Sequence, residues 1–288
     1  MANKLHDLVA PGRLASVMSA HNPLSARLAE LAGFDGVWAS GFELSTAYGL
    51  PDASLLSFTQ HLDMTRAIVE RVSVPVVADL DTGYGNAVNV MHVVGAYAHA
   101  GVAAVVIEDK TFPKDTSLLA GGRQDLVRVE EFQGKIAAAC AAGSERDLLV
   151  IARTEALIAD LGLEEALKRA HAYAEAGADM ILVHSKQKTP DEIVAFARRW
   201  QGSTRPVVVP TAYPDLTEAR IRELDNIGMV IYGNHAIRAA VTAMRQVFAE
   251  IRADGGIHNA NRRIASVEEI FELQRVAEMK SIEQKYLR

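Results

Sequence analysis

Residues 103–110 read Ala-Ala-Val-Val-Ile-Glu-Asp-Lys, an apolar run that ends abruptly in two carboxylates and a lysine. A near-continuous run of β-branched residues, without polar alternation, is typical of a strand buried on both faces, as in a parallel sheet. Comparable runs occupy residues 13–20, 35–40, 74–80, 147–154, 179–185, 206–211 and 228–234. The sequence therefore predicts eight buried parallel strands.

Segments with helical periodicity separate these runs. Residues 54–72, 162–179 and 189–200 place apolar residues three and four positions apart, and Thr189-Pro190-Asp191 is a helix-start signal. Eight strand-then-helix units in roughly 250 residues are the pattern of a (β/α)8 TIM-type barrel. A doubly wound open sheet is the alternative, but no GxGxxG motif follows an early strand. The barrel is the favoured fold.

The C-terminal segment 266–288 extends beyond the last expected barrel helix. Ser266 is placed as an N-cap, with a glutamate three residues later. An amphipathic helix is then predicted from the spacing of Val267, Ile270, Phe271, Leu273, Val276 and Met279. We expect one barrel domain over residues 1–288, with 266–288 as a helical extension whose apolar side packs on a neighbouring subunit or on its own barrel.

Composition narrows the functional classes. The formal net charge of −6 offers no basic face for nucleic acid, and no apolar stretch is long enough for a signal peptide or a membrane span. The only cysteine, Cys140, lies among alanines, where a small buried helix residue is expected rather than a nucleophile. One cysteine permits no intramolecular disulfide and fits a reducing compartment, so a cytoplasmic location is expected.

Charged and polar residues gather where the predicted strands end. The C-terminal ends of barrel strands meet at one mouth, which is where the active sites of such barrels lie. Consecutive runs end in Ser40-Gly41, in Asp79 and Asp81, in Glu108 and Lys110, in Arg153, and in His184. The N-terminal ends of the same runs carry fewer charges, and solubility alone does not account for that asymmetry.

Three of these side chains suggest a metal site. The two-residue period of a strand puts Asp79 and Asp81 on one side, and Glu108 arrives from the adjacent strand. Carboxylates crowded into a partly buried mouth repel one another unless a cation lies among them. A set of oxygen ligands favours Mg²⁺ first and Mn²⁺ second over zinc. The alternative is that these acids cap helices or pair with Lys110 and Arg153.

The strands facing the acids offer positive and donor groups. Arg153 and His184 together would suit a dianionic phosphoryl or phosphonate group, although His184 alone could be a packed barrel residue. Ser40-Gly41-Phe42 leaves its strand through a glycine, so the backbone N–H groups there can turn toward an anion. An acidic metal site opposite an anion site is therefore predicted.

These motifs resemble a known family. WASGFELS, VVADLDTGYGN, VVIEDKTFPKDTS, IARTEALIA, VVVPTAY and VIYGNHAIRAA occur in the order seen in the phosphoenolpyruvate mutase/isocitrate lyase superfamily, and the resemblance covers nearly the whole chain. It implies a (β/α)8 barrel whose last helix is exchanged between subunits. It also implies a homo-oligomer, usually a tetramer built as a dimer of dimers, and a Mg²⁺-bound 2-oxo or enol acid.

The loop after the fourth strand selects a branch of that superfamily. Its lyases carry a cysteine in a KKCGH-like loop, where this chain has KTFPKDTS, so isocitrate and methylisocitrate lyase activities are not expected. EDKTFPK followed by hydroxyl-bearing residues resembles the branch that acts on phosphonopyruvate. Mutases of this branch resemble KTNS, whereas Thr116 stands here at the asparagine position, as in the phosphonopyruvate hydrolases, which release pyruvate and phosphate.

The resemblance also implies residue roles. Mg²⁺ would be held directly by Asp79 and through water by Asp81, Glu108 and Asp52, with Mn²⁺ or Co²⁺ as alternatives. Thr116 would attack phosphorus or orient water, unless it is only a turn residue. Arg153 and His184 would bind the phosphonate. Ser40 and the amides of Gly41 and Phe42 would stabilise the leaving enolate. Lys110 would neutralise Glu108 or assist the anion.

Three other functions remain open at this point. A mutase would use the same residues to interconvert phosphonopyruvate and phosphoenolpyruvate. A 2-oxo-acid decarboxylase or C–C hydrolase would not need the Arg153 and His184 pair. A non-catalytic barrel would bind phosphorylated metabolites without consuming them.

Overall fold

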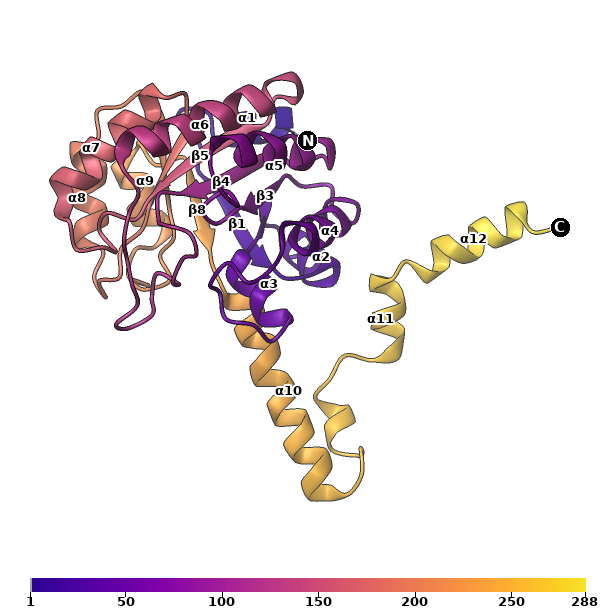
Figure 1. The fold of residues 1–288 in the computed structure, drawn as a ribbon. Coiled ribbons are helices and arrows are strands. Elements are labelled where there is room, and N and C mark those ends of the chain that lie inside the picture. Colours follow the sequence, from indigo (N-terminus) through magenta and orange to yellow (C-terminus); the bar gives the residue numbers. More distant parts are fainter. Residues whose placement is uncertain (1) are drawn as a thin grey trace. The chain divides into compact units, whose positions relative to one another are not determined.

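The computed structural model describes residues 2–288 and contains a closed barrel of eight parallel strands (Figure 1). Each strand pairs with the next along the chain, and β1 pairs with β8 to close the barrel. The strands are β1 (Ala15–Ala20), β2 (Gly36–Ala39), β3 (Val76–Asp79), β4 (Ala104–Glu108), β5 (Leu149–Thr154), β6 (Met180–Val183), β7 (Arg205–Val208) and β8 (Met229–Tyr232). All eight predicted strands are confirmed, and the open-sheet alternative is wrong.

Helices cover the outside of the barrel. They are α2 (Pro23–Leu31), α3 (Gly41–Ala47), α4 (Phe58–Val69), α5 (Ala87–His99), α6 (Val129–Gly143), α7 (Gly162–Glu175), α8 (Asp191–Arg199) and α9 (Glu218–Leu224). Their buried sides pack on the outward residues of the strands, as Val94 and Phe132 pack in one cluster with Val105. Burying each such side chain stabilises the fold by roughly 1.5–3 kcal/mol. The start signal at residues 189–191 is confirmed to within two residues, because α8 begins at Asp191.

The N-terminal end of the barrel is closed by packing. The short helix α1 (Ala2–Leu8) inserts Leu5, which is fully buried, into the cluster of apolar residues that fills the barrel interior. Arg205 at the start of β7 then donates hydrogen bonds to the carbonyl oxygens of Val9, Ala10 and Arg13. The first residues of the chain are thereby fastened across the end of the barrel opposite the strand C-termini.

The same packing explains where the polar layer begins. Val77, Ile151 and Leu182 belong to the interior cluster. Since side chains alternate along a strand, two residues further on the chain faces inward again. That step leads to a layer near the C-terminal mouth that comprises Ser19, Ser40, Asp79, Glu108, Arg153, His184, Val209 and Gly233.

The chain divides into two compact units, one ending at Ala236 and the other running from Ile237 to Arg288. The second contains most of α10 (His235–Asp254), together with α11 (Val267–Leu273) and α12 (Val276–Tyr286). Ser266 caps α11 as predicted, by accepting a hydrogen bond from the amide of Glu269 (3.1 Å). Residues 2–288 contain no helix with both the length and the apolar character that crossing a membrane requires.

One prediction for the C-terminal segment is wrong. A continuous amphipathic helix was expected over Val267 to Met279, but Arg275 adopts a left-handed backbone conformation (φ 57°) that separates α11 from α12. An arginine carries no signal for this conformation, unlike the glycine or asparagine that usually adopts it. The expectation of one domain over residues 1–288 and the exchange of the last helix between subunits stay predictions.

Candidate active site

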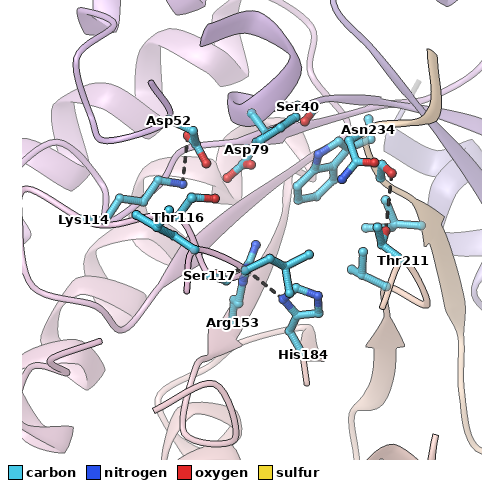
Figure 2. A pocket seen from close by; sticks show the side chains of 17 residues that line it. Ser40, Asp52, Asp79, Lys114, Thr116, Ser117, Arg153, His184, Thr211 and Asn234 are labelled. Atoms are coloured by element: carbon cyan, nitrogen blue, oxygen red, sulfur yellow. Dashed lines mark hydrogen bonds and ion pairs between the residues drawn. The ribbon is translucent and has the colours of Figure 1, made fainter. Parts of the chain in front are cut away.

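A cavity of about 310 Å³ lies in the barrel unit at the C-terminal ends of the strands (Figure 2). Seven of the predicted residues line it, namely Ser40, Phe42, Asp52, Asp79, Thr116, Arg153 and His184. Its wall also contains Trp38, Lys114, Ser117, Leu118, Leu119, Val209, Thr211, Ile231, Gly233 and Asn234. The other predicted residues, Gly41, Asp81, Glu108 and Lys110, do not line the cavity but contact residues that do.

Asp79 is held in place by two backbone amides. Its Oδ2 accepts a hydrogen bond from the amide of Gly41 (3.2 Å), and its Oδ1 accepts one from the amide of Asp81 (3.3 Å). A Cβ on Gly41 would lie 3.0 Å from the Asp81 carboxylate and 3.2 Å from that of Asp79. A larger residue here would therefore push the two carboxylates aside by a few tenths of an ångström, and glycine leaves them undisturbed.

Asp81 approaches Asp79 by a different route from the predicted one. β3 ends at Asp79, and Asp81 has a left-handed backbone conformation (φ 50°), so the two-residue period of a strand does not apply to it. Its side chain reaches the acidic group through a turn, and the amide of Gly83 closes that turn on the carbonyl of Leu80 (2.8 Å). The two aspartates do converge, but for a different reason.

Lys114 is a site residue that sequence reasoning missed. It belongs to the loop of residues 111–125, and its Nζ lies 2.6 Å from Asp81 Oδ1, 3.3 Å from Asp52 Oδ1 and 3.7 Å from Glu108 Oε1. Figure 2 shows its side chain directed toward Asp52. The lysine is visible in the KTFPKDTS segment, but nothing in the sequence indicates that the loop folds back over the acids.

The acidic group has features that fit a metal ion. Buried oxygens of Asp52, Asp81 and Glu108 accept no hydrogen bond, although Lys114 or Arg153 approaches each of them as an ion pair. Buried carboxylate oxygens that accept no hydrogen bond are suitable ligands for a hard cation. Five buried carboxylates, those of Asp52, Asp79, Asp81, Glu108 and Glu155, face the three cations Lys110, Lys114 and Arg153. The formal excess of two negative charges matches one divalent ion.

Within the described part of the chain, no three His, Cys, Asp or Glu side chains are placed to bind one metal ion directly. The predicted arrangement gives only Asp79 a direct bond and reaches the other acids through water, so it does not require such a cluster. The metal set therefore stays a prediction.

Without a bound metal, protonation would reduce the repulsion among the buried carboxylates. Burial raises the pKa of Asp79 above its ordinary value, with Lys114 and Arg153 opposing the shift. Burial likewise raises the pKa of Asp81 to about 7, against the influence of Lys114. Near neutral pH Asp81 is therefore poised to exchange a proton for a cation.

Arg153 and His184 form the opposite side of the cavity. The Arg153 guanidinium donates from Nη2 to His184 Nδ1 (3.3 Å), and its Nε lies 3.3 Å from Glu108 Oε2. Burial, and then the charge of Arg153, lower the pKa of His184 to about 3, so the imidazole is neutral at physiological pH. Since Nδ1 accepts from arginine, Nε2 carries the proton, and this buried donor has no partner. Arg153 and His184 can thus offer N–H groups to an anion.

Contrary to the prediction, Lys110 does not pair with Glu108. Its Nζ lies 3.2 Å from Glu155 Oε2 and donates to Ser117 Oγ (2.9 Å). Glu108 is paired instead with Arg153 and Lys114. Beyond β4 the chain turns into the loop, so the strand period no longer predicts the direction of Lys110. Glu155 and Ser117 belong to the IARTEALIA and KTFPKDTS segments, but no role for either follows from the sequence.

Thr116 lies on the loop between the two sides of the cavity (Figure 2). The loop is fastened by several bonds: Lys110 Nζ donates to the carbonyl of Asp115 (2.8 Å), Gln124 Nε2 donates to that of Thr116 (3.3 Å), and the Arg123 amide donates to Asp115 Oδ2 (2.6 Å). A threonine hydroxyl therefore lines a cavity that has carboxylates on one side and an arginine with a neutral imidazole on the other.

Comparisons with known proteins bear on this site. Residues 5–252 match the family model described as phosphoenolpyruvate phosphomutase. The chain is 62% identical over 277 residues to phosphonopyruvate hydrolase of Variovorax sp. (strain Pal2), which covers 96% of each chain. A crystal structure of phosphonopyruvate hydrolase with oxalate and Mg²⁺ is similar at 58% identity, with a TM-score of 0.94 over 100% of this chain and 99% of that one.

A structure of phosphoenolpyruvate phosphomutase from Streptomyces platensis subsp. rosaceus is similar at 46% identity, with a TM-score of 0.97 over 100% of this chain and 99% of that one. The backbone thus fits the hydrolase and the mutase about equally well, and sequence identity is what separates the two. Given the family-model match over most of its length, this chain belongs to the phosphoenolpyruvate phosphomutase family.

Proposed function

We propose that this chain is a Mg²⁺-dependent phosphonopyruvate hydrolase, which cleaves the carbon–phosphorus bond to give pyruvate and phosphate. The observation that carries the proposal is the 62% identity, over 96% of both chains, to a phosphonopyruvate hydrolase. The geometry supports it, because Thr116 lines the cavity together with Asp79, Arg153 and His184. A crystal structure of a similar hydrolase contains Mg²⁺, which supports the same ion here.

The acidic side of the cavity would hold the pyruvoyl half of the substrate. Asp79, with Asp81, Glu108 and Asp52 through water, would bind Mg²⁺, whose charge would polarise the 2-oxo group and favour the enolate. Ser40 lies at the start of α3, where its own hydroxyl and the amide of Phe42 can donate to the leaving enolate. The Gly41 amide already donates to Asp79, so it positions this metal-binding carboxylate and does not contact the substrate.

The basic side would hold the phosphonate. Arg153 supplies fixed positive charge, and the unpartnered Nε2–H of the neutral His184 supplies a donor. Transfer of a phosphoryl group depends mainly on such positioning and charge neutralisation. The bond from C3 to phosphorus breaks, its electron pair passes into the enolate, and protonation at C3 gives pyruvate.

The new bond to phosphorus comes from an oxygen nucleophile. Either the Thr116 hydroxyl attacks, and water later releases phosphate from the threonine, or Thr116 orients a water molecule that attacks directly. Both routes consume one water molecule for each phosphate released. Both need a hydroxyl at position 116, which acts as donor and acceptor.

The test is to incubate the purified protein with phosphonopyruvate and Mg²⁺ and to follow phosphorus by NMR. Equal amounts of inorganic phosphate and pyruvate are expected, with loss of turnover after treatment with EDTA and recovery on adding Mg²⁺. An EDTA-treated protein that keeps its full rate would contradict the metal requirement.

A mutase is the second candidate, supported by the likeness to the Streptomyces mutase. The same assay separates the two: a mutase would produce phosphoenolpyruvate in place of free phosphate and pyruvate. If the phosphonopyruvate signal disappears and neither set of products forms, both functions are contradicted.

We also propose that the protein is a homo-oligomer, with a dimer of dimers as the expected form, that residues 266–288 pack on another subunit, and that it acts in the cytoplasm. Apolar side chains in the segment are exposed, with Val267 61%, Phe271 49% and Ile282 53% accessible to solvent. Apolar surface of this kind gains stability when it is covered. The single cysteine supports the reducing compartment.

A further inference from the structure

The carboxylate of Glu155 is fully buried just beyond the end of β5, and no step of the proposed reaction uses it. Its Oε1 accepts a hydrogen bond from Arg153 Nε (2.5 Å), and its Oε2 lies 3.2 Å from Lys110 Nζ. Burial alone would raise the pKa of Glu155, but Arg153 and Lys110 hold it well below its ordinary value. The side chain is therefore ionised and holds two cations.

Ser117 brings the loop into the same group of contacts. Its hydroxyl donates to Glu155 Oε2 (2.5 Å) and accepts hydrogen bonds from Lys110 Nζ and Arg153 Nη2, both at 2.9 Å. A serine hydroxyl has one proton and two lone pairs, and here all three are engaged. The docked position of the loop and the position of Arg153 are thus fixed by shared contacts.

Glu155 is held from the side away from the loop. Its backbone amide donates to Asp109 Oδ1 (2.9 Å). Asp109 Oδ2 accepts hydrogen bonds from the hydroxyl of Tyr173 (2.7 Å) and from Arg169 Nη1 (3.1 Å), both on α7. The barrel therefore fixes Glu155 independently of the loop, so the loop can dock against a preformed carboxylate.

We propose that Glu155 is a positioning residue that couples docking of the loop to the orientation of Arg153. With the loop docked, the guanidinium is held by Glu155 from the barrel and by Ser117 from the loop. When the loop leaves, Ser117 withdraws from both residues, and Arg153 keeps only its barrel contacts. The inference rests on the proposed function in one respect, namely that Arg153 contacts the phosphonate.

The competing explanation is that Glu155 only neutralises two buried cations and so supports the fold. Under that explanation, any variant with an equal loss of stability would change the cleavage rate of the loop by the same factor. Coupling instead predicts a specific effect on the loop, because loop residue Ser117 contacts the Glu155 carboxylate directly. The behaviour of the loop without any ligand therefore separates the two explanations.

The first experiment measures trypsin cleavage at Arg123, whose side chain is about half exposed on the loop, in the ligand-free protein. Glu155→Gln keeps the shape of the side chain but removes its charge, and Ser117→Ala removes the partner hydroxyl. Each change is expected to speed cleavage about tenfold, because a charge-assisted hydrogen bond is lost. The double variant should be cleaved no faster than Ser117→Ala alone, since Ser117→Ala already removes the hydrogen bond to Glu155 together with those from Lys110 and Arg153.

Glu43→Gln is the matched control, because it also removes the charge of a fully buried carboxylate, whose partners are Ser19 Oγ (2.6 Å) and His21 Nδ1 (2.9 Å) rather than loop residues or Glu155. When the variants are compared at equal distances below their melting temperatures, Glu43→Gln should keep the native cleavage rate. An equal acceleration in this control, or an unchanged rate in Glu155→Gln, overturns the coupling. If Glu155→Gln does not fold, Ser117→Ala carries the same test.

The second experiment uses turnover. In Glu155→Gln, kcat/KM for phosphonopyruvate should fall about a hundredfold, whereas the inhibition constant of oxalate, which lacks a phosphonate, should change less than about threefold. Glu155→Asp, which keeps the charge, should recover part of the loss. A parallel loss of oxalate binding would contradict a role through Arg153. Failure of the native protein to hydrolyse phosphonopyruvate would refute the proposed function but leave the trypsin result interpretable.

Discussion

At the scale of single residues, the site depends on a close contact at Gly41 that a larger side chain would disturb. The amide of Gly41 bonds to Asp79 because α3 begins directly against the two aspartates. The sequence indicated that backbone N–H groups at this position would face an anion, and the anion bound by Gly41 in the structure is the protein's own carboxylate. One glycine thus fixes the orientation of the side chain predicted to bind the metal.

Replacing Thr116 tests the proposed nucleophile or water-orienting group. Thr116→Ala should lower kcat about a thousandfold, since either route needs a hydroxyl at this position. Thr116→Ser keeps the hydroxyl and should stay within about tenfold of the native rate. Pyruvate release gives the rates and thermal unfolding reports on the fold. Near-native turnover in Thr116→Ala would remove Thr116 from the mechanism.

The affinity for Mg²⁺ should depend on pH through Asp81. Since burial raises the pKa of Asp81 to about 7, Mg²⁺ must displace a proton at lower pH. The association constant should therefore fall about tenfold between pH 8 and pH 6, with close to one proton released per ion bound at pH 6. Calorimetry in buffers of different ionisation enthalpy measures both quantities, and Asp81→Asn should flatten the pH dependence. A constant affinity across this range would contradict the prediction.

The same raised pKa affects stability without metal. In the unfolded chain Asp81 would titrate near its ordinary value, so between that value and pH 7 the folded form binds the additional proton. Stability of the metal-free protein from this source is thus present at acid pH and lost as the pH rises through 7. Bound Mg²⁺ should suppress that loss.

At the scale of elements, the strands could be predicted from the sequence and the loop could not. Runs such as residues 103–109 reveal buried strands, and alternation along them then predicts that Asp79, Glu108, Arg153 and His184 share one layer. Residues after the strand ends follow turns and loops instead. The directions of Asp81 and Lys110, and the roles of Lys114, Ser117 and Glu155, depend on how residues 111–125 fold back, and no periodicity encodes that path.

Replacing Lys114 should move metal binding and turnover in opposite directions. Its ammonium lies among Asp52, Asp81 and Glu108, where it competes electrostatically with a bound cation. Lys114→Met should tighten Mg²⁺ binding about tenfold while lowering turnover, because the loop loses its attachment to the acids. The exposed Lys188 provides the control Lys188→Met, which should change neither quantity. Weaker Mg²⁺ binding in Lys114→Met would contradict this account.

At the scale of the whole molecule, the C-terminal unit should govern assembly. Analytical ultracentrifugation of the native chain should give a multiple of 31.1 kDa, with a tetramer expected. Phe271→Asp combined with Ile282→Asp should lower the assembled mass, because charges would replace exposed apolar groups that pack on another subunit. Val88→Asp, at an apolar residue of the barrel unit that is even more exposed (77%), is the control. A monomeric native protein would overturn the proposal.

The closed N-terminal end of the barrel determines how substrate enters and how products leave. Leu5 and the packed interior leave no route through the floor, and Arg205 keeps the first residues in place there. The active-site cavity is thus closed at one end, so substrate and products must use the same opening beside the loop. Pyruvate and phosphate would each have to leave through that opening before the next substrate binds, so an excess of either product would slow turnover.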